Sequence, residues 1–309
     1  MTVGIGAGNF IGLAIETVPG TYVAPTEFFP IRSENLQWQQ DTVWRRVIAQ
    51  TADPLGAVAG NGHVEGDVDM ELLEAVLPYF LLAARGELVQ GGSTPNFTYT
   101  FTPDSDAVPD TTLSIAVVRN GITFGYVGCV VAGMNFGVDN GMATVTLSML
   151  GQSEASQSLP TLTLPTTSPF GSGTWSVQVP TASQVFDTDN FSLGVDDGGE
   201  PQNRLRDELG AQFIKYGERS VTLSVERDFE SRTEYDAFKA LTAKSINVDV
   251  DKSANNYVHF QVPAAIVDSY EVATPGVGDL VRASVSYMGT QHVDGAYNIE
   301  VGCQEDLAL

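Results

Sequence analysis

Residues 144–149 read Thr-Val-Thr-Leu-Ser-Met, and residues 220–225 read Ser-Val-Thr-Leu-Ser-Val. Apolar and polar residues alternate in both stretches, which is typical of a β-strand with one buried face and one exposed face. Many glycines and prolines separate such runs, and the pairs Asn120-Gly121 and Asn140-Gly141 suit tight hairpin turns. The sequence therefore predicts a mainly β protein.

Each half of the chain also contains one predicted short helix that follows a strand. In the first half, apolar residues recur at helical spacing through residues 73–81, with Asp69 placed to cap the helix and Pro78 expected to kink or break it. In the second half, residues 231–234 form a capping box, and apolar residues at helical spacing follow through residues 235–241.

The two halves carry their patterns in the same order, which indicates an internal duplication. The strand at residues 62–70 and its helix match residues 217–228 and the second helix, and residues 145–151 match residues 283–289. A segment rich in Ser, Thr and Pro without apolar periodicity lies between them, as in an inter-domain linker. We therefore predict a first domain at 1–152, a linker at 153–173, and a second domain with a C-terminal tail at 174–309.

The chain is strongly acidic, with 38 Asp and Glu against 15 Lys and Arg and a formal net charge of -23 at pH 7. A surface that binds nucleic acid through its phosphates is therefore not expected. Cys129 and Cys303 lie far apart without metal-ligand spacing, which excludes a disulfide scaffold and fits either a reducing compartment or two unpaired thiols. Because no secretory signal or long apolar run is present, we expect a protein that is neither exported nor inserted in a membrane.

No residue pattern points to catalysis, a metal or a cofactor. His63, His259 and His292 lack metal-ligand spacing with one another or with a cysteine. The run that begins at Asp249 is similar to the start of a calcium loop, but the glycine and glutamate that such a loop needs are absent. Two carboxylates of a hydrolase on a β scaffold remain an open alternative, although no pair of acids stands out.

The N-terminal region resembles the start of tail tube proteins of long, non-contractile-tailed bacteriophages. The resemblance rests on residues 16–26, Glu-Thr-Val-Pro-Gly-Thr-Tyr-Val-Ala-Pro-Thr, on residues 62–68 before the first helix, and on residues 126–151. It covers residues 10–152 well and residues 184–291 more loosely. Its motifs are glycine and strand patterns rather than chemical signatures.

This resemblance implies β-sandwich or partial-barrel domains, each flanked by one short helix, that join their sheets into a ring of six. Rings of that kind stack into the tube through which viral DNA leaves the head. Because this chain carries two such domains in tandem, we expect a ring of three chains with pseudo-sixfold symmetry rather than a ring of six chains. The resemblance implies a structural protein without catalytic residues or cofactors.

The expected partners are further copies of the chain and other tail proteins, namely the tape measure, tail tip and terminator proteins. Double-stranded DNA would pass through without binding, and no membrane would be involved. We expect the protein in the virion tail, after assembly in the host cytoplasm. The alternative is a host-attachment or carbohydrate-binding β-sandwich protein of the virion, although the tryptophans Trp38, Trp44 and Trp175 do not cluster in the sequence.

A conduit for DNA needs an inner wall to which a polyanion does not adhere. In residues 64–69, Val-Glu-Gly-Asp-Val-Asp, the carboxylates occupy alternate positions and so share one strand face. Residues 225–228 and 248–251 repeat this pattern. The predicted lumen-facing acids are Glu65, Asp67, Asp69, Glu226, Asp228, Asp249 and Asp251; the alternative is that they lie on ordinary solvated strand faces.

Two long connectors carry paired arginines. Arg45 and Arg46 lie between the strand that ends near Trp38 and the strand that begins at Gly62. On so anionic a chain, such pairs predict arms that reach an acidic rim of the adjacent ring, or else neutralise nearby acids. The equivalent connector of the second half contains Arg204 and Arg206. The sequence leaves open whether the tail at 292–309 pairs with a neighbour or folds back.

Overall fold

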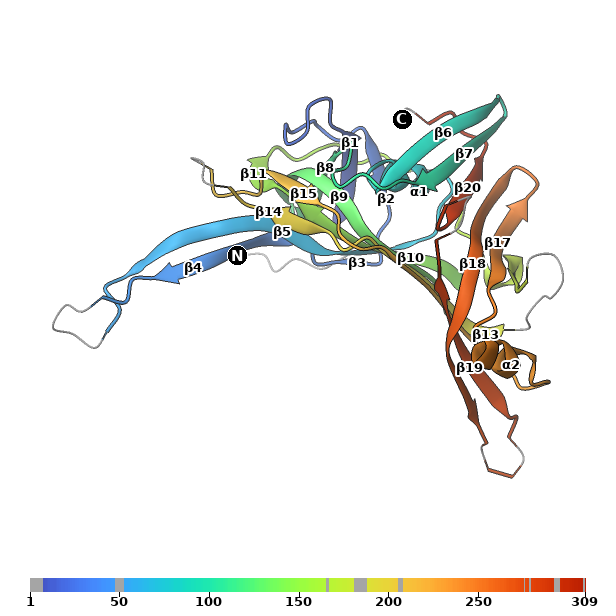
Figure 1. Ribbon diagram of the computed structural model, residues 1–309. Helices are drawn as coiled ribbons and strands as arrows, with labels where there is room; N and C mark the ends of the chain where they lie inside the picture. The colour runs from blue at the N-terminus through green and yellow to red at the C-terminus, as the bar shows by residue number, and fades with distance from the viewer. Residues whose placement is uncertain are drawn as a thin grey trace.

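We describe a computed structural model, in which the described residues are 8–47, 53–164, 167–180, 188–204, 208–274, 276–277, 279–291, 295–307 and 309. It is mainly β, as predicted, with two short helices and a long curved sheet (Figure 1). In the first half the elements are β1 (Phe10–Ile15), β2 (Glu27–Phe29), β3 (Ser33–Glu34), β4 (Gln37–Trp44), β5 (Ala57–Glu71), α1 (Leu77–Leu82), β6 (Gly86–Ser93), β7 (Asn96–Pro103), β8 (Leu113–Arg119), β9 (Ile122–Asp139), β10 (Met142–Gly151) and β11 (Ser153–Gln157).

The second half follows with a 3-10 turn and nine more strands. Its elements are η2 (Ser172–Thr174), β12 (Trp175–Gln178), β13 (Thr188–Asp196), β14 (Glu200–Gln202), β15 (Phe213–Lys215), β16 (Ser220–Asp228), α2 (Thr233–Ala240), β17 (Lys244–Ser253), β18 (Asn256–Ala273), β19 (Arg282–Gly289) and β20 (Asn298–Cys303).

The two halves share one order of hydrogen-bonded strands. In the first half the neighbours run β1, β8, β9, β10, β5, β4. In the second half they run β12, β17, β18, β19, β16, β13. The helix follows the equivalent strand in each half, since α1 comes after β5 and α2 after β16. The repeated order supports the interpretation of an internal duplication, while the domain limits stay a prediction.

Strands of the two halves also pair with each other. Residues 133–137 of β9 pair antiparallel with β13, so the first sheet continues into the second. The C-terminal strand β20 lies between β18 and β7, which belongs to a hairpin with β6. The tail therefore folds back onto its own chain, which settles the question that the sequence left open.

The predicted hairpin turns are present. Asn120 and Gly121, between β8 and β9, have φ values of 51° and 78°, and Asn140 and Gly141, between β9 and β10, have φ values of 49° and 81°. Two consecutive left-handed residues are what a tight hairpin turn requires, and Asn-Gly adopts them at low cost.

Both helices differ in detail from the expectation. Helix α1 begins after Val76, so Pro78 lies in its first turn, where a missing N–H costs little, and no kink results. Asp69 belongs to β5 and does not cap α1. Helix α2 begins after Arg232, whose side chain has no acceptor with which to cap it. The predicted capping box does not form: Ser231 Oγ accepts from the Thr233 N–H at 3.4 Å, and Glu234 is buried beside Arg227 rather than turned back to the helix start.

Part of the segment predicted as a linker is structured. Ser153–Gln157 forms β11, which pairs with the first part of β9. Further along, the Phe170 side chain is fully buried, and Gly171 forms a bridge with Met142. The polar composition that favoured a linker here also suits a short strand at the surface.

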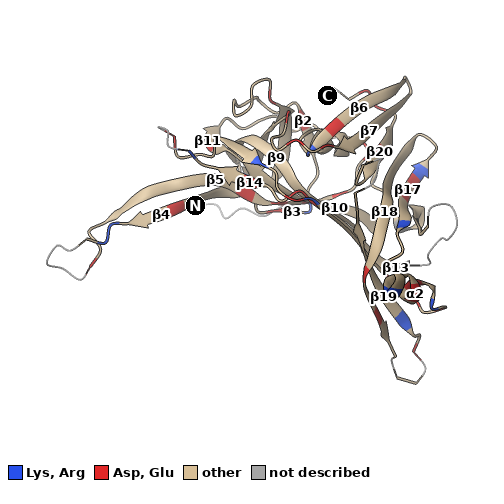
Figure 2. Ribbon diagram, viewed as in Figure 1, with Lys and Arg blue, Asp and Glu red and all other residues tan. Residues whose placement is uncertain are grey.

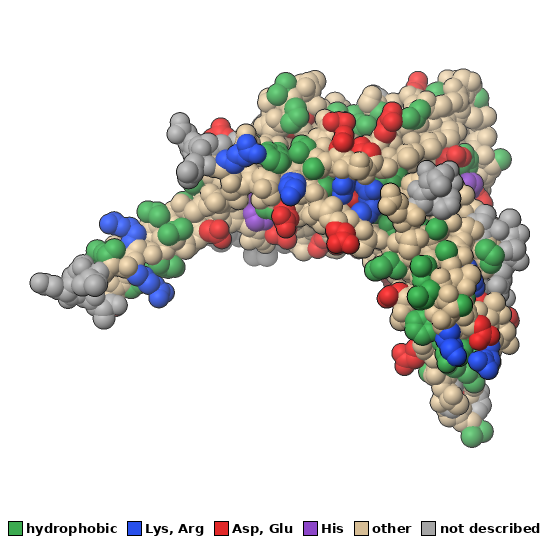
Figure 3. Space-filling view, viewed as in Figure 1, with side chains coloured by type: hydrophobic (Ala, Val, Ile, Leu, Met, Phe, Trp, Pro, Cys, Tyr) green, Lys and Arg blue, Asp and Glu red, His purple; other side chains and the backbone are tan. Residues whose placement is uncertain are grey.

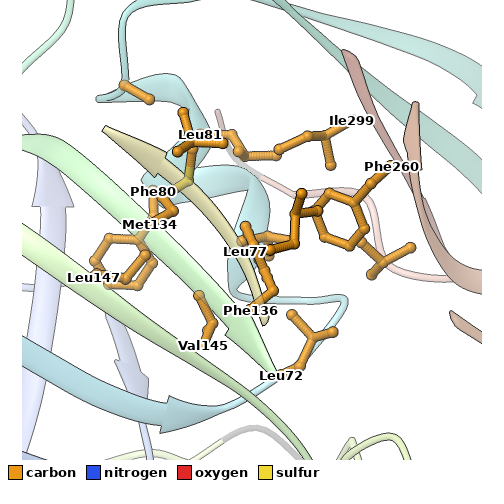
Figure 4. Close-up of a cluster of buried hydrophobic side chains, with 14 of the residues drawn as sticks. Leu72, Leu77, Phe80, Leu81, Met134, Phe136, Val145, Leu147, Phe260 and Ile299 are labelled. Carbon is orange, nitrogen blue, oxygen red and sulfur yellow. The ribbon is translucent and has the colours of Figure 1, made fainter. Parts of the chain in front are cut away.

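One hydrophobic core extends through both halves. Helix α1 packs its apolar side chains onto β9 and β10, and the core continues to β18 and β20 of the second half (Figure 4). The rings of Phe136 and Phe260, one from each half, lie 4.4 Å apart between centroids. Each fully buried side chain of this kind contributes roughly 1.5–3 kcal/mol to folding, so the halves stabilise each other. Neither helix is long and apolar enough to cross a membrane within the described residues.

Candidate functional site

Eight strands form a continuous arch across the molecule, in the order β4, β5, β10, β9, β13, β16, β19, β18. The β4–β5 hairpin extends from one end of the arch, and β18 and β19 form the other end (Figure 1). The space-filling view shows the hollow between these two ends, with acidic side chains along it (Figure 3). We call the side of the arch that faces this hollow the concave face.

Polar side chains occupy the concave face because residues alternate along each strand. Asp67 of β5 lies opposite Ser148 of β10, whose hydroxyl donates to the carboxylate at 2.7 Å. Asp69 lies opposite Thr146 in the same way, at 3.4 Å. Val68, between the two acids, points to the other side and is fully buried. The pattern continues in the second half, where Ser, Thr and Gly lie on the same face.

A groove of about 760 Å³ lies at the middle of the concave face, where the two halves join. Small or polar residues make up most of its wall, and two methionines and a few aliphatic residues complete it. Ser192 Oγ of β13 donates to Asn135 Oδ1 of β9 at 2.7 Å across the junction. The polar and glycine residues of the groove are Glu65, Gly66, Asp67, Gly133, Asn135, Thr146, Ser148, Gly194, Asp196, Gly198, Gly199, Ser220 and Thr222.

The concave face is acidic. Strand register places nine carboxylates on it: Glu65, Asp67, Asp69, Glu71, Asp139, Asp196, Glu226, Asp228 and Glu271. Among the described residues two arginines accompany them, and both are paired with acids. The Arg32 guanidinium contacts Asp139 and lies 3.8 Å from Asp69, and Arg282 lies 3.4 Å from Glu226.

Five of the seven predicted acids lie together on the concave face: Glu65, Asp67, Asp69, Glu226 and Asp228. The structure does not bring Asp249 and Asp251 there. Both lie on β17, outside the eight-strand arch, on the side of the molecule away from the hollow (Figure 2). Gln178 donates to Asp249 at 3.2 Å, and Asp251 lies 2.7 Å from Nε2 of His259. Burial raises the pKa of Asp249 against the opposing effect of His259.

The two arginine-bearing connectors have different structures. Arg45 continues the β4–β5 hairpin through backbone hydrogen bonds with Gly56 and Leu55, and both Arg45 and Arg46 are exposed near the end of this arm. Residues 48–52, at the tip, lie outside the described residues. The second connector instead packs on the first half.

Contacts with the first half hold the second connector in place. Its Leu209 carbonyl accepts from the Gly62 N–H, and its Ala211 N–H donates to the Gln152 carbonyl. Arg204 lies over the Phe213 ring, 5.2 Å from the centroid. Arg206 lies outside the described residues.

The three tryptophans occupy separate surroundings. Trp38 is half-buried on β4, and Trp44 is exposed on the β4–β5 arm. The Trp175 ring packs against the Phe191 ring at 4.4 Å between centroids. They do not form the shared aromatic platform that the carbohydrate-binding alternative would need.

Sequence reasoning missed the small polar residues of the concave face, although the alternation in β10 and β16 contains them. It also missed a buried carboxylate at the opposite side of the first half. Glu16 accepts hydrogen bonds from Thr112 Oγ1 at 2.6 Å, Ser114 Oγ at 2.8 Å, and the backbone N–H groups of Gly20 and Gly128 at 2.7 and 2.9 Å. Because its hydrogen bonds are satisfied, Glu16 fixes the loop after β1 rather than supplying chemistry.

The family described as "Phage tail tube protein" matches residues 6–289, nearly the whole chain. No curated protein matches the chain.

Proposed function

The chain belongs to the phage tail tube protein family, and we propose that three copies close into a ring whose stacked layers form the conduit for viral DNA. The family match confirms the resemblance found in the sequence. The protein is thus a structural component of the virion tail and assembles with itself and with other tail proteins. The tape measure, tail tip and terminator proteins are the partners that we propose.

One observation carries the proposal: a single chain holds an eight-strand arch made of two equivalent sets of four strands, with one continuous concave face. Three copies would supply six such sets, which fits a pseudo-sixfold ring. The sheet already curves in the sense that a closed cylinder needs. Closing the ring would also pair the strand edges at the two ends of each arch, which are otherwise free. Closed rings are the common outcome when identical subunits join head to tail with a rotation that returns to the start.

The charge of the concave face supports its role as the wall of the bore. Each phosphate neutralised by a cation adds binding free energy, so a wall that is to release DNA should offer none. Here Arg32 and Arg282 are paired with acids, and the surrounding carboxylates repel phosphate. Small Ser, Thr and Gly residues also leave few flat apolar surfaces against which bases could stack. We place Glu65, Asp67, Asp69, Glu226 and Asp228 in the lumen and leave out Asp249 and Asp251.

The exposed β4–β5 arm supports a contact between rings. It leaves the body of the molecule as a two-stranded ribbon, and its described end carries Arg45 and Arg46 on a chain that is otherwise strongly acidic. We propose that these arginines meet carboxylates of the adjacent ring. Because the second connector is folded against its own chain, Arg204 is not part of this contact.

Electron microscopy of the purified full chain tests the proposed function. We expect hollow tubes by negative stain, and cross-sections with three identical units whose two halves are alike. Refinement at higher resolution should place the concave face at the bore. Discrete monomers at all concentrations, six chains per ring, or a bore lined by unpaired arginine and lysine would contradict the proposal.

A further inference from the structure

The junction between β9 and β13 is a strand pairing that the chain makes with itself. Its register places Ser192 opposite Gly137, Gly194 opposite Asn135 and Asp196 opposite Gly133. The Asp197 N–H extends the ladder by donating to the Ala132 carbonyl at 2.9 Å. This pairing joins the last strand of one repeated set to the first strand of the next.

Strand registers fix which residues of the two halves are equivalent. Ser148 of β10 lies opposite Asp67 and Gly133, and Ser286 of β19 lies opposite Ser224 and Ser269. Ser148 and Ser286 also occupy the same place in the sequence match between residues 145–151 and 283–289. The bulges of the two long strands also lie at equivalent positions. The register of β9 with β10 passes over Ala132, and the register of β18 with β19 passes over Asp268 at the same point of the ladder.

The same reasoning relates β4 to β13. On β5, Glu65 lies opposite Gln37, and at the equivalent place on β16, Thr222 lies opposite Gly194. Continuing along both strands makes Trp38 equivalent to Val195 and Gln39 equivalent to Asp196. The partner of β13 in the junction is β9, whose equivalent is the second part of β18. In the first repeat β4 therefore occupies the place that β13 has in the second, and in the second repeat β18 occupies the place that β9 has in the first. Within the described chain, β4 and β18 do not pair with each other.

Both of these strands have one edge that pairs with no other described strand. β4 pairs with β5 alone, and residues 269–273 of β18 pair with β19 alone. They lie at the two ends of the arch (Figure 1). Unpaired backbone groups along such edges are templates for pairing with another chain.

We infer that β4 of one chain pairs antiparallel with β18 of the next chain in the register of the β9–β13 junction. This inference rests on the proposed ring. It places Gln37 opposite Glu271, Trp38 opposite Tyr270 and Gln39 opposite Ser269. A second copy of this chain is thus the partner of both edges, and the contact between chains repeats the contact within the chain.

The residue pairs in this register are chemically complementary. On the concave face, the exposed Gln37 amide can donate to the exposed Glu271 carboxylate. On the other face, the half-buried Trp38 and Tyr270 rings form an aromatic cross-strand pair. The Tyr270 hydroxyl is buried without a hydrogen-bond partner in the described chain, and its ring already packs on Tyr235 of α2 at 5.7 Å.

Backbone geometry limits the length of the pairing. The Leu36 carbonyl already accepts hydrogen bonds from Tyr126 and Arg119, so the ladder between chains begins at Gln37. The Asn35 N–H donates to β5, and the N–H groups of alternate residues therefore point to the same side. The backbone N–H and C=O groups of Trp38 and Gln40 consequently point away from β5, toward the free edge of β4. In the proposed pairing the Gln40 N–H donates to the Asp268 carbonyl of the next chain, as the Asp197 N–H donates to the Ala132 carbonyl within one chain.

Disulfide trapping in the full chain tests this register. Gln37 and Glu271 form a non-hydrogen-bonded pair, in which Cα atoms lie about 4.5 Å apart, a separation that a disulfide spans. The variant Q37C/E271C is assembled, oxidised and run on a non-reducing gel. The control Q37C/S269C places the thiols on a diagonal about 7–8 Å apart, beyond the reach of a disulfide. The pair N135C/G194C is the positive control, because it should close within one chain.

We expect Q37C/E271C to yield dimers and then trimers that return to monomers on reduction, with at least tenfold less cross-linking for Q37C/S269C and for each single variant. The native Cys129 and Cys303 are buried and should not contribute. Tubes that form without this cross-link, or that cross-link equally in the diagonal control, would overturn the register while leaving the proposed function intact. Specific cross-links without tubes would support the pairing and contradict the proposed function, and the absence of both would overturn both.

Discussion

Asp197 and Arg219 form a buried ion pair at the place where the second half of the chain meets the first. Oδ1 of Asp197 lies 2.6 Å from Nε of Arg219, and the two side chains are 2% and 14% exposed. Arg219 also donates to the Arg85 carbonyl of the first half at 3.1 Å and lies over the Tyr297 ring. Burial raises the pKa of Asp197, and Arg219 opposes that rise. The buried Asp197 carboxylate therefore needs the Arg219 guanidinium beside it to stay charged at low free-energy cost.

Removing one partner of this pair should be costly, because the other charge stays buried without compensation. We expect D197A to lower the free energy of unfolding by about 3–5 kcal/mol, measured by urea denaturation of the unassembled chain. The matched control is D236A, which removes an exposed acid that pairs with Arg232 on α2 and should cost less than about 0.5 kcal/mol. Equal losses for the two variants would show that the Asp197 pair does not join the halves.

If the concave face lines the bore as proposed, reversing its charges should turn that wall from repelling DNA to binding it. We expect E65K/D67K to assemble, because both side chains are exposed, and its particles to eject DNA more slowly. Open tubes of this variant should retain short duplex DNA with an affinity that falls steeply with salt. The control E230K/D236K makes the same charge change at exposed acids near or on α2. Normal ejection by E65K/D67K would count against the lumen assignment.

Reversing charges on the β4–β5 arm should affect stacking more than ring closure. We expect R45E/R46E to give single rings or short stacks, seen by negative stain and by a smaller sedimentation coefficient. R232E/K239E makes the same charge change at the start and in the last turn of α2, away from the arm, and should still give long tubes. If both variants polymerise alike, Arg45 and Arg46 do not hold the rings together.

Alkaline pH should destabilise the chain through Tyr126. Burial raises the pKa of this phenol to about 12, and its hydroxyl donates to the Leu36 carbonyl at 3.0 Å. In the unfolded chain it ionises near pH 10, so the folded state holds the proton longer and stability falls as pH rises from 10 to 12.

The variant Y126F isolates this effect from the other tyrosines. Its loss of stability between pH 10 and 12 should be smaller than that of the wild type by up to about 2.7 kcal/mol, measured by urea denaturation at each pH. A Y126F curve parallel to the wild type would contradict the expectation.

Sequence periodicity predicted the strands and the tight turns because both depend on local chemistry. Alternation at residues 144–149 sorts side chains between two faces wherever the strand is placed, and Asn-Gly at 140–141 adopts left-handed backbone in any hairpin. Helix limits were less accurate. Pro78 is compatible with a first turn as well as with a break, and the capping box at 231–234 lost its glutamate to a buried contact with Arg227.

The arrangement of the strands could not be read from the sequence. Residues 64–69 and 248–251 alternate in the same way, yet the first stretch lies on the concave face and the second lies on β17, since alternation fixes the faces of a strand but not its sheet. The pairing of β9 with β13 leaves no pattern in composition, because any two free edges can share backbone hydrogen bonds. Three-dimensional register was needed to recognise the concave face as one surface.

The β9–β13 pairing within one chain has a consequence for the kinetics and cost of assembly. Each independent molecule that joins a complex gives up translational and rotational freedom, an expense of several kcal/mol, whereas tethered segments meet at a high effective concentration. In the proposed ring, three polypeptides that each hold two strand sets in contact need two associations to complete a layer, whereas six single-repeat chains would need five. Dilute subunits of this kind should therefore nucleate more readily than separate single-repeat chains of equal interface strength.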